Sequence, residues 1–319
     1  MNDKPFYVVT TINNPIRWES RPTQAIKAIT SWLQEPAVIV YIVRVTYGAR
    51  PYDDLGPLEN HPRVVHINVK ASTLAWSKEN CLNIGISRLP HDAEFVGTFD
   101  ADIIWRKPGW ANEIKHALQL YPVVQPWKTC YDLGPNDDHI QTHRSFASLY
   151  HEGKPVTPNN KKFWKHDGGP YEYAHSGFAW AYTMQILNLM GGLFEHGGMG
   201  SGDHHMALGL VGLQEKSMPE GTDPMYQMMV NVWSARAKLH VNGKIGYIPS
   251  TIEHLFHGSK TKRKYVGRWD MFVNHKFNPL TDLKKNVHGV IEFSGNKPEL
   301  EREFTNYFES RNEDANTLD

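Results

Sequence analysis

Residues 94–105 read EFVGTFDADIIW, a mostly apolar, strand-like run that reaches two aspartates and continues with three more apolar residues. In an open α/β sheet, functional side chains lie at the carboxyl ends of the strands. Asp100 and Asp102 are two positions apart, so their carboxylates point the same way in an extended segment. Like charges in that position repel unless a cation lies between them. Hard oxygen ligands of this kind suit Mg²⁺ or Mn²⁺.

A solvated turn is the competing interpretation, because aspartate is common where strands end. The tripeptide by itself is frequent and does not define a site. Here apolar residues flank the two aspartates on both sides. A solvated turn is not usually enclosed in that way, which favours a functional role for the pair.

The segments around this strand alternate between strand-like and helix-like patterns. Runs of β-branched residues predict buried strands, and apolar residues at helical spacing predict helices. The predicted strands are 7–12, 38–45, 63–69, 94–99, 123–125 and 245–248, and the predicted helices include 23–33, 76–89, 110–120 and 223–240. This alternation predicts an α/β fold with a doubly wound, mostly parallel central sheet flanked by helices.

Composition limits the classes of protein that the chain could be. Its 319 residues suit one large α/β domain or two small ones. Lys and Arg together number 34, as do Asp and Glu, which argues against binding nucleic acid through global charge and leaves a local basic patch open. Cys81 and Cys130 form no disulfide or zinc pattern. With no signal-peptide pattern and no long apolar run, we expect a cytoplasmic protein without membrane insertion.

The stretch FVGTFDADIIWRKPGW resembles the DxD region of GT-A-fold glycosyltransferases, which bind nucleotide-diphosphate sugars through a divalent metal. Three more segments are similar to motifs of that family in the same order. Residues 78–86 resemble the helix that precedes the DxD strand in that family. Residues 175–181 resemble a strand that lines the sugar pocket of galactosyltransferase-like members. Residues 200–206 resemble the glutamate–aspartate element of the same members. The resemblance spans about residues 5–270.

The resemblance implies a domain organisation. Residues 1–270 would form a GT-A-like catalytic domain, in which the turn-rich stretch 130–171 is a loop-rich insertion. Residues 271–319 would form a C-terminal extension with a terminal helix and a frayed acidic tail.

The resemblance also implies a set of metal ligands. Asp100 and Asp102 would bind the donor ribose and the metal, Mn²⁺ or Mg²⁺. His257, directly before a glycine, is the best match for a third ligand near the end of the catalytic domain, with His254 as second choice. Neutral imidazole is more suited to Mn²⁺ than to Ca²⁺. The alternative is a structural histidine, since the chain has 17 of them.

Asp203, which follows the glycine-rich stretch 191–202, matches the general base of inverting members. Its carboxylate would take the proton of an acceptor hydroxyl as that hydroxyl attacks the sugar carbon. Gly202 stands where the family carries a glutamate, which leaves the acceptor contacts and the stereochemical outcome open. His204 or His205 is an alternative base if the register of the match shifts by one residue. An ordinary N-cap aspartate after a flexible turn is the competing interpretation.

The remaining predicted contacts are to the donor and the sugar. Basic side chains beside a metal would hold the diphosphate as negative charge develops; a solvated loop or a contact with nucleic-acid phosphates is the alternative. The predicted donor-binding residues are Thr10, Thr11, Lys78, Asn83, Asp100, Lys260, Lys262 and Arg263. The predicted acceptor and sugar pocket consists of Gly177, Trp180, Gly202 and His204, with core packing as the alternative for Trp180.

Together these features predict a metal-dependent glycosyltransferase that uses a nucleotide-diphosphate sugar, by resemblance a UDP-sugar. The acceptor is either a hydroxymethylated base in DNA, as for some phage-encoded sugar transferases, or a cytoplasmic glycan. No obligate protein partner is indicated. Two other classes fit the same residues: a metal-dependent phosphohydrolase, and a non-catalytic module that binds nucleotide sugars or glycans.

Overall fold

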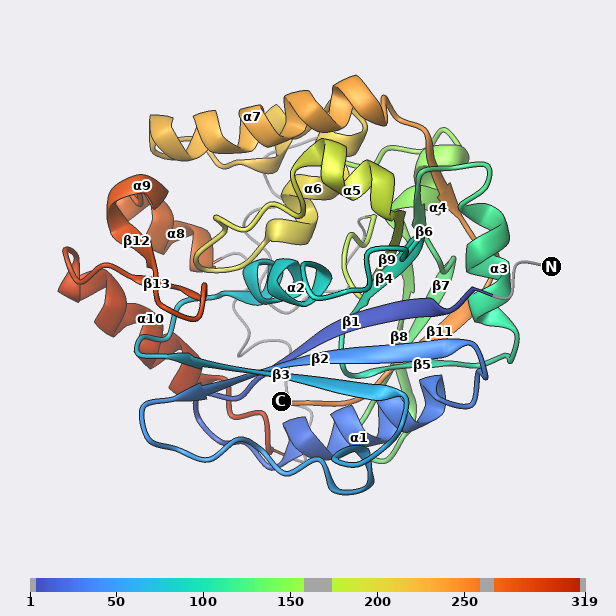
Figure 1. Ribbon diagram of the computed structural model, residues 1–319. Helices are drawn as coiled ribbons and strands as arrows, with labels where there is room; N and C mark the ends of the chain where they lie inside the picture. The colour runs from blue at the N-terminus through green and yellow to red at the C-terminus, as the bar shows by residue number, and fades with distance from the viewer. Residues whose placement is uncertain (1–3, 158–173, 259–266, 316–319) are drawn as a thin grey trace.

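The computed structural model describes residues 4–157, 174–258 and 267–315 (Figure 1). Its centre is a seven-stranded sheet in the order β10-β6-β9-β4-β1-β2-β3. Neighbouring strands are parallel except at β9, which runs antiparallel to both β4 and β6. The strands are β1 (Phe6–Asn13), β2 (Val38–Tyr47), β3 (Val64–Ala71), β4 (Phe95–Phe99), β6 (Val123–Gln125), β9 (Ala179–Thr183) and β10 (Ile245–Tyr247). The predicted α/β fold with a mostly parallel sheet is confirmed.

Helices cover both faces of the central sheet because its strands are apolar on both faces. The β2 sequence, VIVYIVRVTY, is buried along nearly its whole length. One face packs against α2 (Lys78–Ile86), α5 (Met184–Met190), α6 (Gly202–Leu210) and α7 (Pro224–His240), and the other against α1 (Ser20–Trp32) and α3 (Trp110–Ala117) (Figure 1). Within the described parts of the chain, no helix combines the length and the apolar character needed to span a membrane.

A second, four-stranded sheet lies beside the first and has the order β5-β11-β7-β8. Its strands are β5 (Ile103–Trp105), β11 (Thr251–His254), β7 (Thr129–Leu133) and β8 (His139–Arg144). The stretch 130–171 was predicted to be loop-rich, but its described part holds β7, β8 and a helix, α4 (Phe146–His151). The turn residues in this stretch make the tight β7–β8 connection, where the Gly134 amide donates to the Asp138 carbonyl.

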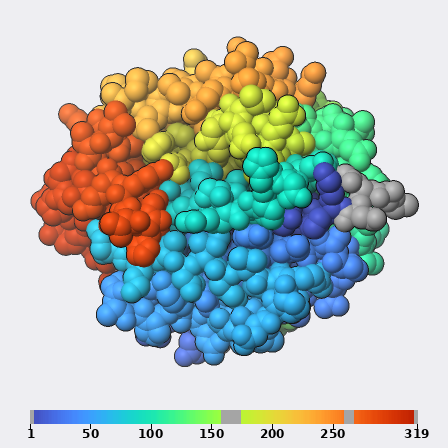
Figure 2. Space-filling view, viewed as in Figure 1, coloured from blue at the N-terminus to red at the C-terminus, as the bar shows by residue number. Residues whose placement is uncertain are grey.

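The C-terminal residues pack against α2 and the β3 side of the central sheet (Figure 2). Val290 lies in an apolar cluster with Val69 and Cys81. Asn80 of α2 joins the two parts: its Oδ1 accepts a hydrogen bond from the Ile291 amide at 2.9 Å. The elements here are α8 (Gly267–Asn274), α9 (Pro279–Asp282), β12 (Leu283–Lys285), β13 (Ile291–Phe293) and α10 (Pro298–Ser310).

Candidate metal centre and its surroundings

The two aspartates after β4 are held by backbone hydrogen bonds to segments far along the chain. The Asp100 amide donates to the Phe178 carbonyl at 2.8 Å, and the Leu255 amide donates to the Asp102 carbonyl at 2.8 Å. From Asp102 the chain enters β5, which pairs antiparallel with β11, so that Ile103 lies opposite His254. Strand pairing therefore brings the histidines near residue 255 to the carboxyl end of β4.

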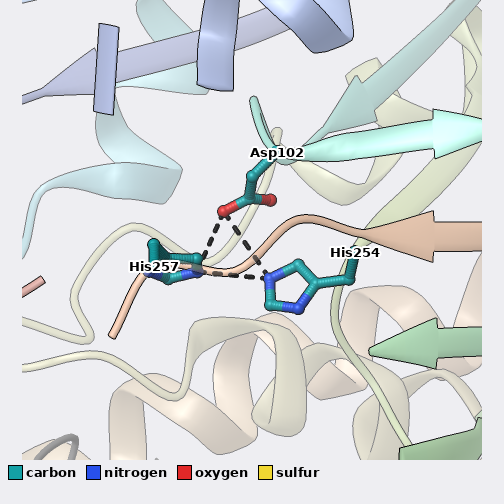
Figure 3. Close-up of side chains that lie close together, drawn as sticks. All are labelled: Asp102, His254 and His257. Atoms are coloured by element: carbon teal, nitrogen blue, oxygen red, sulfur yellow. Dashed lines mark hydrogen bonds and ion pairs between the residues drawn. The ribbon is translucent and has the colours of Figure 1, made fainter. Parts of the chain in front are cut away.

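Asp102, His254 and His257 point toward one another (Figure 3). The Nε2 atom of His257 lies 3.1 Å from Asp102 Oδ2, and the Nε2 atom of His254 lies 3.6 Å from the same oxygen. The two Nε2 atoms are 3.2 Å apart. One ligand atom from each of the three residues lies within 4.8 Å of the others, a spacing at which the three could hold one metal ion.

The donor set of this cluster fits a divalent transition metal. Two imidazole nitrogens and one carboxylate fit Mn²⁺ better than they fit Mg²⁺, since imidazole favours transition metals and carboxylate suits both ions. Asp102 Oδ1 is buried and has no hydrogen-bond partner among the residues that the structure describes. Buried polar atoms in folded proteins are normally paired, so this oxygen is consistent with a ligand position.

The buried carboxylate of Asp132 orients the His254 imidazole through the ring nitrogen that does not face Asp102. Asp132 of β7 accepts from His254 Nδ1 at 2.6 Å through one oxygen and contacts His143 Nε2 at 2.6 Å through the other. Carboxylates in this position fix the ring and direct its second nitrogen at a metal. Neither Asp132 nor His143 was among the predicted site residues, because a lone aspartate and histidine in a turn-rich stretch gave no motif.

The charges in this cluster shift the pKa values of its members. Burial raises the pKa of Asp102, but His254 and His257 lower this pKa by a larger amount. The pKa of Asp102 therefore lies well below its ordinary value. Burial lowers the pKa of His254, while Asp102 and Asp132 raise it, to about 9. A metal must displace the His254 proton in order to bind, because only neutral imidazole is a ligand.

Asp100 differs from its neighbour, although it was predicted as a metal ligand too. Its carboxylate forms an ion pair with Lys78 at the start of α2 and is not part of the three-residue cluster. Burial raises the pKa of Asp100, partly offset by Lys78. Burial opposes the charge on Lys78, yet Asp100, Asp203 and Glu79 around it raise its pKa above the ordinary value. Lys78 therefore stays cationic among three carboxyl groups.

Asp203 lies in the first turn of α6, after Ser201 with its left-handed φ of 66°. Its Oδ1 accepts a hydrogen bond from the His204 amide at 2.8 Å. Gly177 leaves room for the other oxygen, because a Cβ on Gly177 would lie 2.8 Å from Asp203 Oδ2. The structure thus brings Asp203, Gly177 and the Lys78–Asp100 pair into one region.

Glu79 occupies the space beside Gly202. A Cβ on Gly202 would lie 2.5 Å from Glu79 Cδ. Glu79 is only 3% exposed, and burial raises its pKa to about 7, although Lys78 lowers it. A carboxyl group from α2 thus lies beside the backbone at 202, an arrangement that no local sequence pattern indicates.

Several residues that were predicted to contact the donor or the sugar make hydrogen bonds within the protein. Thr10 Oγ1 donates to the Phe99 carbonyl and Thr11 Oγ1 to the Val43 carbonyl, so both tie neighbouring strands together. Asn83 binds the Leu193 carbonyl at 3.0 Å and the Leu193 amide at 2.9 Å, which anchors the glycine-rich segment. Trp180 is 5% exposed and donates to the Ser176 carbonyl, as expected of a core residue.

The structure describes His204, one of the remaining predicted site residues, but not the predicted basic loop. His204 is half-buried next to Asp203, and burial lowers its pKa to about 4 even though Asp203 opposes the shift. It is therefore neutral at pH 7. Lys260, Lys262 and Arg263 lie outside the described residues.

Phe178 is a further residue at this site that the sequence did not single out. Its backbone has a left-handed φ of 74°, which is strained for a bulky side chain. The ring stacks on His175 with centroids 4.0 Å apart and lies 4.7 Å from His254. Strain of this kind collects where the surrounding structure fixes a functional geometry.

The chain matches no family model and no curated protein. It aligns with S. aureus TarS in complex with UDP-GlcNAc at 10% identity, over 96% of this chain and 81% of that chain, with a TM-score of 0.41. GalNAc-T7 with UDP, GalNAc and Mn²⁺ aligns at 13% identity, over 96% of this chain and 55% of that chain, with a TM-score of 0.44. A 4-diphosphocytidyl-2C-methyl-D-erythritol synthase from Anaerococcus prevotii aligns at 11% identity, over 78% and 88%, with a TM-score of 0.36. At these scores the alignments define neither the activity nor the ligands of this chain.

Proposed function

We propose that this chain transfers a sugar from a nucleotide-diphosphate sugar, preferably a UDP-sugar, to an acceptor hydroxyl with the help of Mn²⁺ or Mg²⁺. The observation that carries the proposal is the convergence of Asp102, His254 and His257 at the carboxyl end of β4, with Lys78, Asp100 and Asp203 close by. Residues 1–270 would form the catalytic domain and 271–319 an extension to it.

In this proposal, Asp102, His254 and His257 hold the metal, which when bound supplies Lewis-acid stabilisation to the leaving diphosphate. Lys78 stabilises the negative charge of the Asp100 carboxylate and holds it in place, so that Asp100 can bind the hydroxyls of the donor ribose. His254 gives up its proton before this site is loaded, and Asp132 keeps its ring in position.

Asp203 would act as the general base of an inverting transfer. The acceptor oxygen forms a bond to the anomeric carbon while the bond from that carbon to the diphosphate oxygen breaks. The electron pair leaves with the nucleoside diphosphate, and the hydroxyl proton moves to a carboxylate oxygen of Asp203. Gly177 has no side chain that would clash with one of those oxygens.

A transfer assay tests this function. Purified protein is incubated with Mn²⁺, a panel of nucleotide sugars and two sets of acceptors, hydroxymethylated DNA and oligosaccharides, and the mass of each acceptor is measured. A gain of one sugar with release of nucleoside diphosphate is the expected result. Release of inorganic phosphate without an acceptor would favour a phosphohydrolase, and ligand binding without turnover would favour a non-catalytic module.

A further inference from the structure

The segment after α10 turns back toward the metal cluster instead of fraying. Glu313 is buried, with 1% of its side chain exposed. Its carboxylate pairs with Arg21 of α1 at 2.7 Å and 2.9 Å and with Arg311 at 2.6 Å. Burial raises the pKa of Glu313, but the two arginines lower it far more, so the group is an anion.

The backbone around Glu313 is fixed at two further places. Asp314 accepts hydrogen bonds from the amides of Glu19 and Ser20, at 3.1 Å and 2.9 Å, at the start of α1. Gly258, which directly follows a candidate metal ligand, approaches the segment closely: a Cβ on it would lie 3.0 Å from Glu313 Cα. Its φ of 81° also favours glycine at this position. The C-terminal segment is thus seated against the end of the histidine-bearing strand.

His257 lies between the metal cluster and this segment. Its Nε2 faces Asp102 at 3.1 Å, while its Nδ1 lies 3.7 Å from Glu313 Oε2, within ion-pair range. His254 has the same arrangement, with Nε2 toward Asp102 and Nδ1 on the buried carboxylate of Asp132. Each of the two imidazoles therefore has one nitrogen directed at the candidate metal position and a carboxylate near the other.

We propose that Glu313 is a positioning residue for His257, so that the C-terminal segment completes the metal centre. The proposal rests on the proposed function, since it assumes that the cluster binds a metal. A metal on Nε2 requires the imidazole proton on Nδ1, and an anion facing Nδ1 stabilises that tautomer and the ring orientation. Asp132 does this for His254 from within the second sheet; Glu313 does it for His257 from residues 271–319.

Mn²⁺ binding to the full-length chain tests the proposal without any assay of turnover. Electron paramagnetic resonance measures free Mn²⁺ and hence affinity, and electron spin echo modulation detects nitrogen ligands of bound Mn²⁺. Glu313→Ala should weaken Mn²⁺ binding about 10- to 100-fold. At saturating Mn²⁺ this variant should show one imidazole coupling where the wild type shows two. Glu313→Gln, whose amide oxygen can still accept from Nδ1, should lose less affinity and keep both couplings.

Asp314→Asn is the matched control, because it alters the docking of the same segment on α1 without touching His257. It should keep wild-type affinity and both couplings. Equal weakening in Asp314→Asn and Glu313→Ala, or two imidazole couplings in Glu313→Ala, would overturn the positioning role. Circular dichroism without metal confirms that each variant folds. No Mn²⁺ binding by the wild type would instead overturn the metal centre of the proposed function, and this inference with it.

Discussion

Two aspartates in one tripeptide have different surroundings in this protein. Asp102 faces two imidazoles, whereas Asp100 faces the ammonium group of Lys78. The spacing in sequence predicted that both carboxylates would lie at the carboxyl end of β4. It could not predict which of them faces a metal, because the partners come from residues 78, 254 and 257, which only the fold brings together.

Asp102→Asn tests the metal ligand. The amide removes the negative charge and one strong oxygen donor, so Mn²⁺ affinity should fall by more than about 100-fold, beyond the effect of changing an outer-shell partner. Isothermal titration calorimetry with Mn²⁺ measures this. Asp92→Asn serves as control, because Asp92 is exposed and is not part of the cluster of Asp102, His254 and His257. This variant should bind Mn²⁺ as the wild type does. Unchanged affinity in Asp102→Asn would remove this residue from the site.

Asp203→Asn tests the general base. The amide cannot take a proton, so transfer should slow by about 10²- to 10⁴-fold, while donor binding stays within a few-fold of wild type. Initial rates and UDP titrations measure the two effects. Asp223→Asn makes the same substitution at the N-cap of α7, where asparagine caps equally well, and should leave the transfer rate unchanged. A variant at 203 that retains the full rate would show that another group is the base.

Glu79 predicts a pH dependence of stability. Its folded-state pKa of about 7 lies above the ordinary 4.5, so the folded chain binds this proton more tightly than the unfolded chain does. The contribution to stability is full below about pH 4.5 and is lost as pH rises through 7. The shift corresponds to about 3 kcal/mol at most. Glu79→Gln should therefore gain stability over wild type at pH 8 and little at pH 5.

Urea unfolding of both proteins at the two pH values measures this difference. Glu113→Gln, at an exposed position of α3, should differ from wild type by the same small amount at both pH values. A gain for Glu79→Gln that does not depend on pH would contradict the raised pKa.

At the scale of elements, the β-branched runs and helical spacings predicted β1, β2, β3, β4, β6 and β10 of the central sheet and several of the helices that cover it, but not β9. The second sheet was missed. Its strands are three to six residues long and are stabilised by pairing with distant segments, as β5 is by β11, so they leave little local pattern. This omission matters for the candidate metal centre, because β7 and β11 carry Asp132 and His254.

Local sequence patterns also failed to predict the contacts of α2, because its polar residues have partners far along the chain. Asn80 is 1% exposed; it accepts from the Ile291 amide and donates to Gly289 and to Glu195. Asn80→Ala would leave several of these buried groups unpaired and should lower the free energy of unfolding by roughly 2–3 kcal/mol. Hydrogen exchange of the Ile291 amide should accelerate as well.

Denaturant unfolding and hydrogen exchange followed by mass spectrometry check both effects. Asn231→Ala, on the exposed face of α7, should change stability by less than about 0.5 kcal/mol. Unaltered exchange in β13 of Asn80→Ala would show that this side chain does not hold the C-terminal residues on α2.

At the scale of the whole molecule, the order of motifs along the chain predicted that site residues would meet where β4 ends. The structure groups Asp102, His254 and His257 there, with Asp203 near Lys78 and Asp100. The C-terminal residues were expected to end in a frayed acidic tail. Glu313 is instead buried between two arginines and beside His257. Charge composition could not reveal this, because a run of acidic residues is normally a solvated surface.

Metal-dependent binding of a nucleoside diphosphate is the most direct test of the central claim. We would titrate UDP into the wild-type chain by calorimetry, once with saturating Mn²⁺ and once with EDTA, and repeat both titrations with Asp102→Asn. The account predicts binding in the presence of Mn²⁺, and its loss both with EDTA and in the variant. UDP that binds equally well with EDTA, or fails to bind with Mn²⁺, would contradict a metal-assisted transfer from a UDP-sugar at this site.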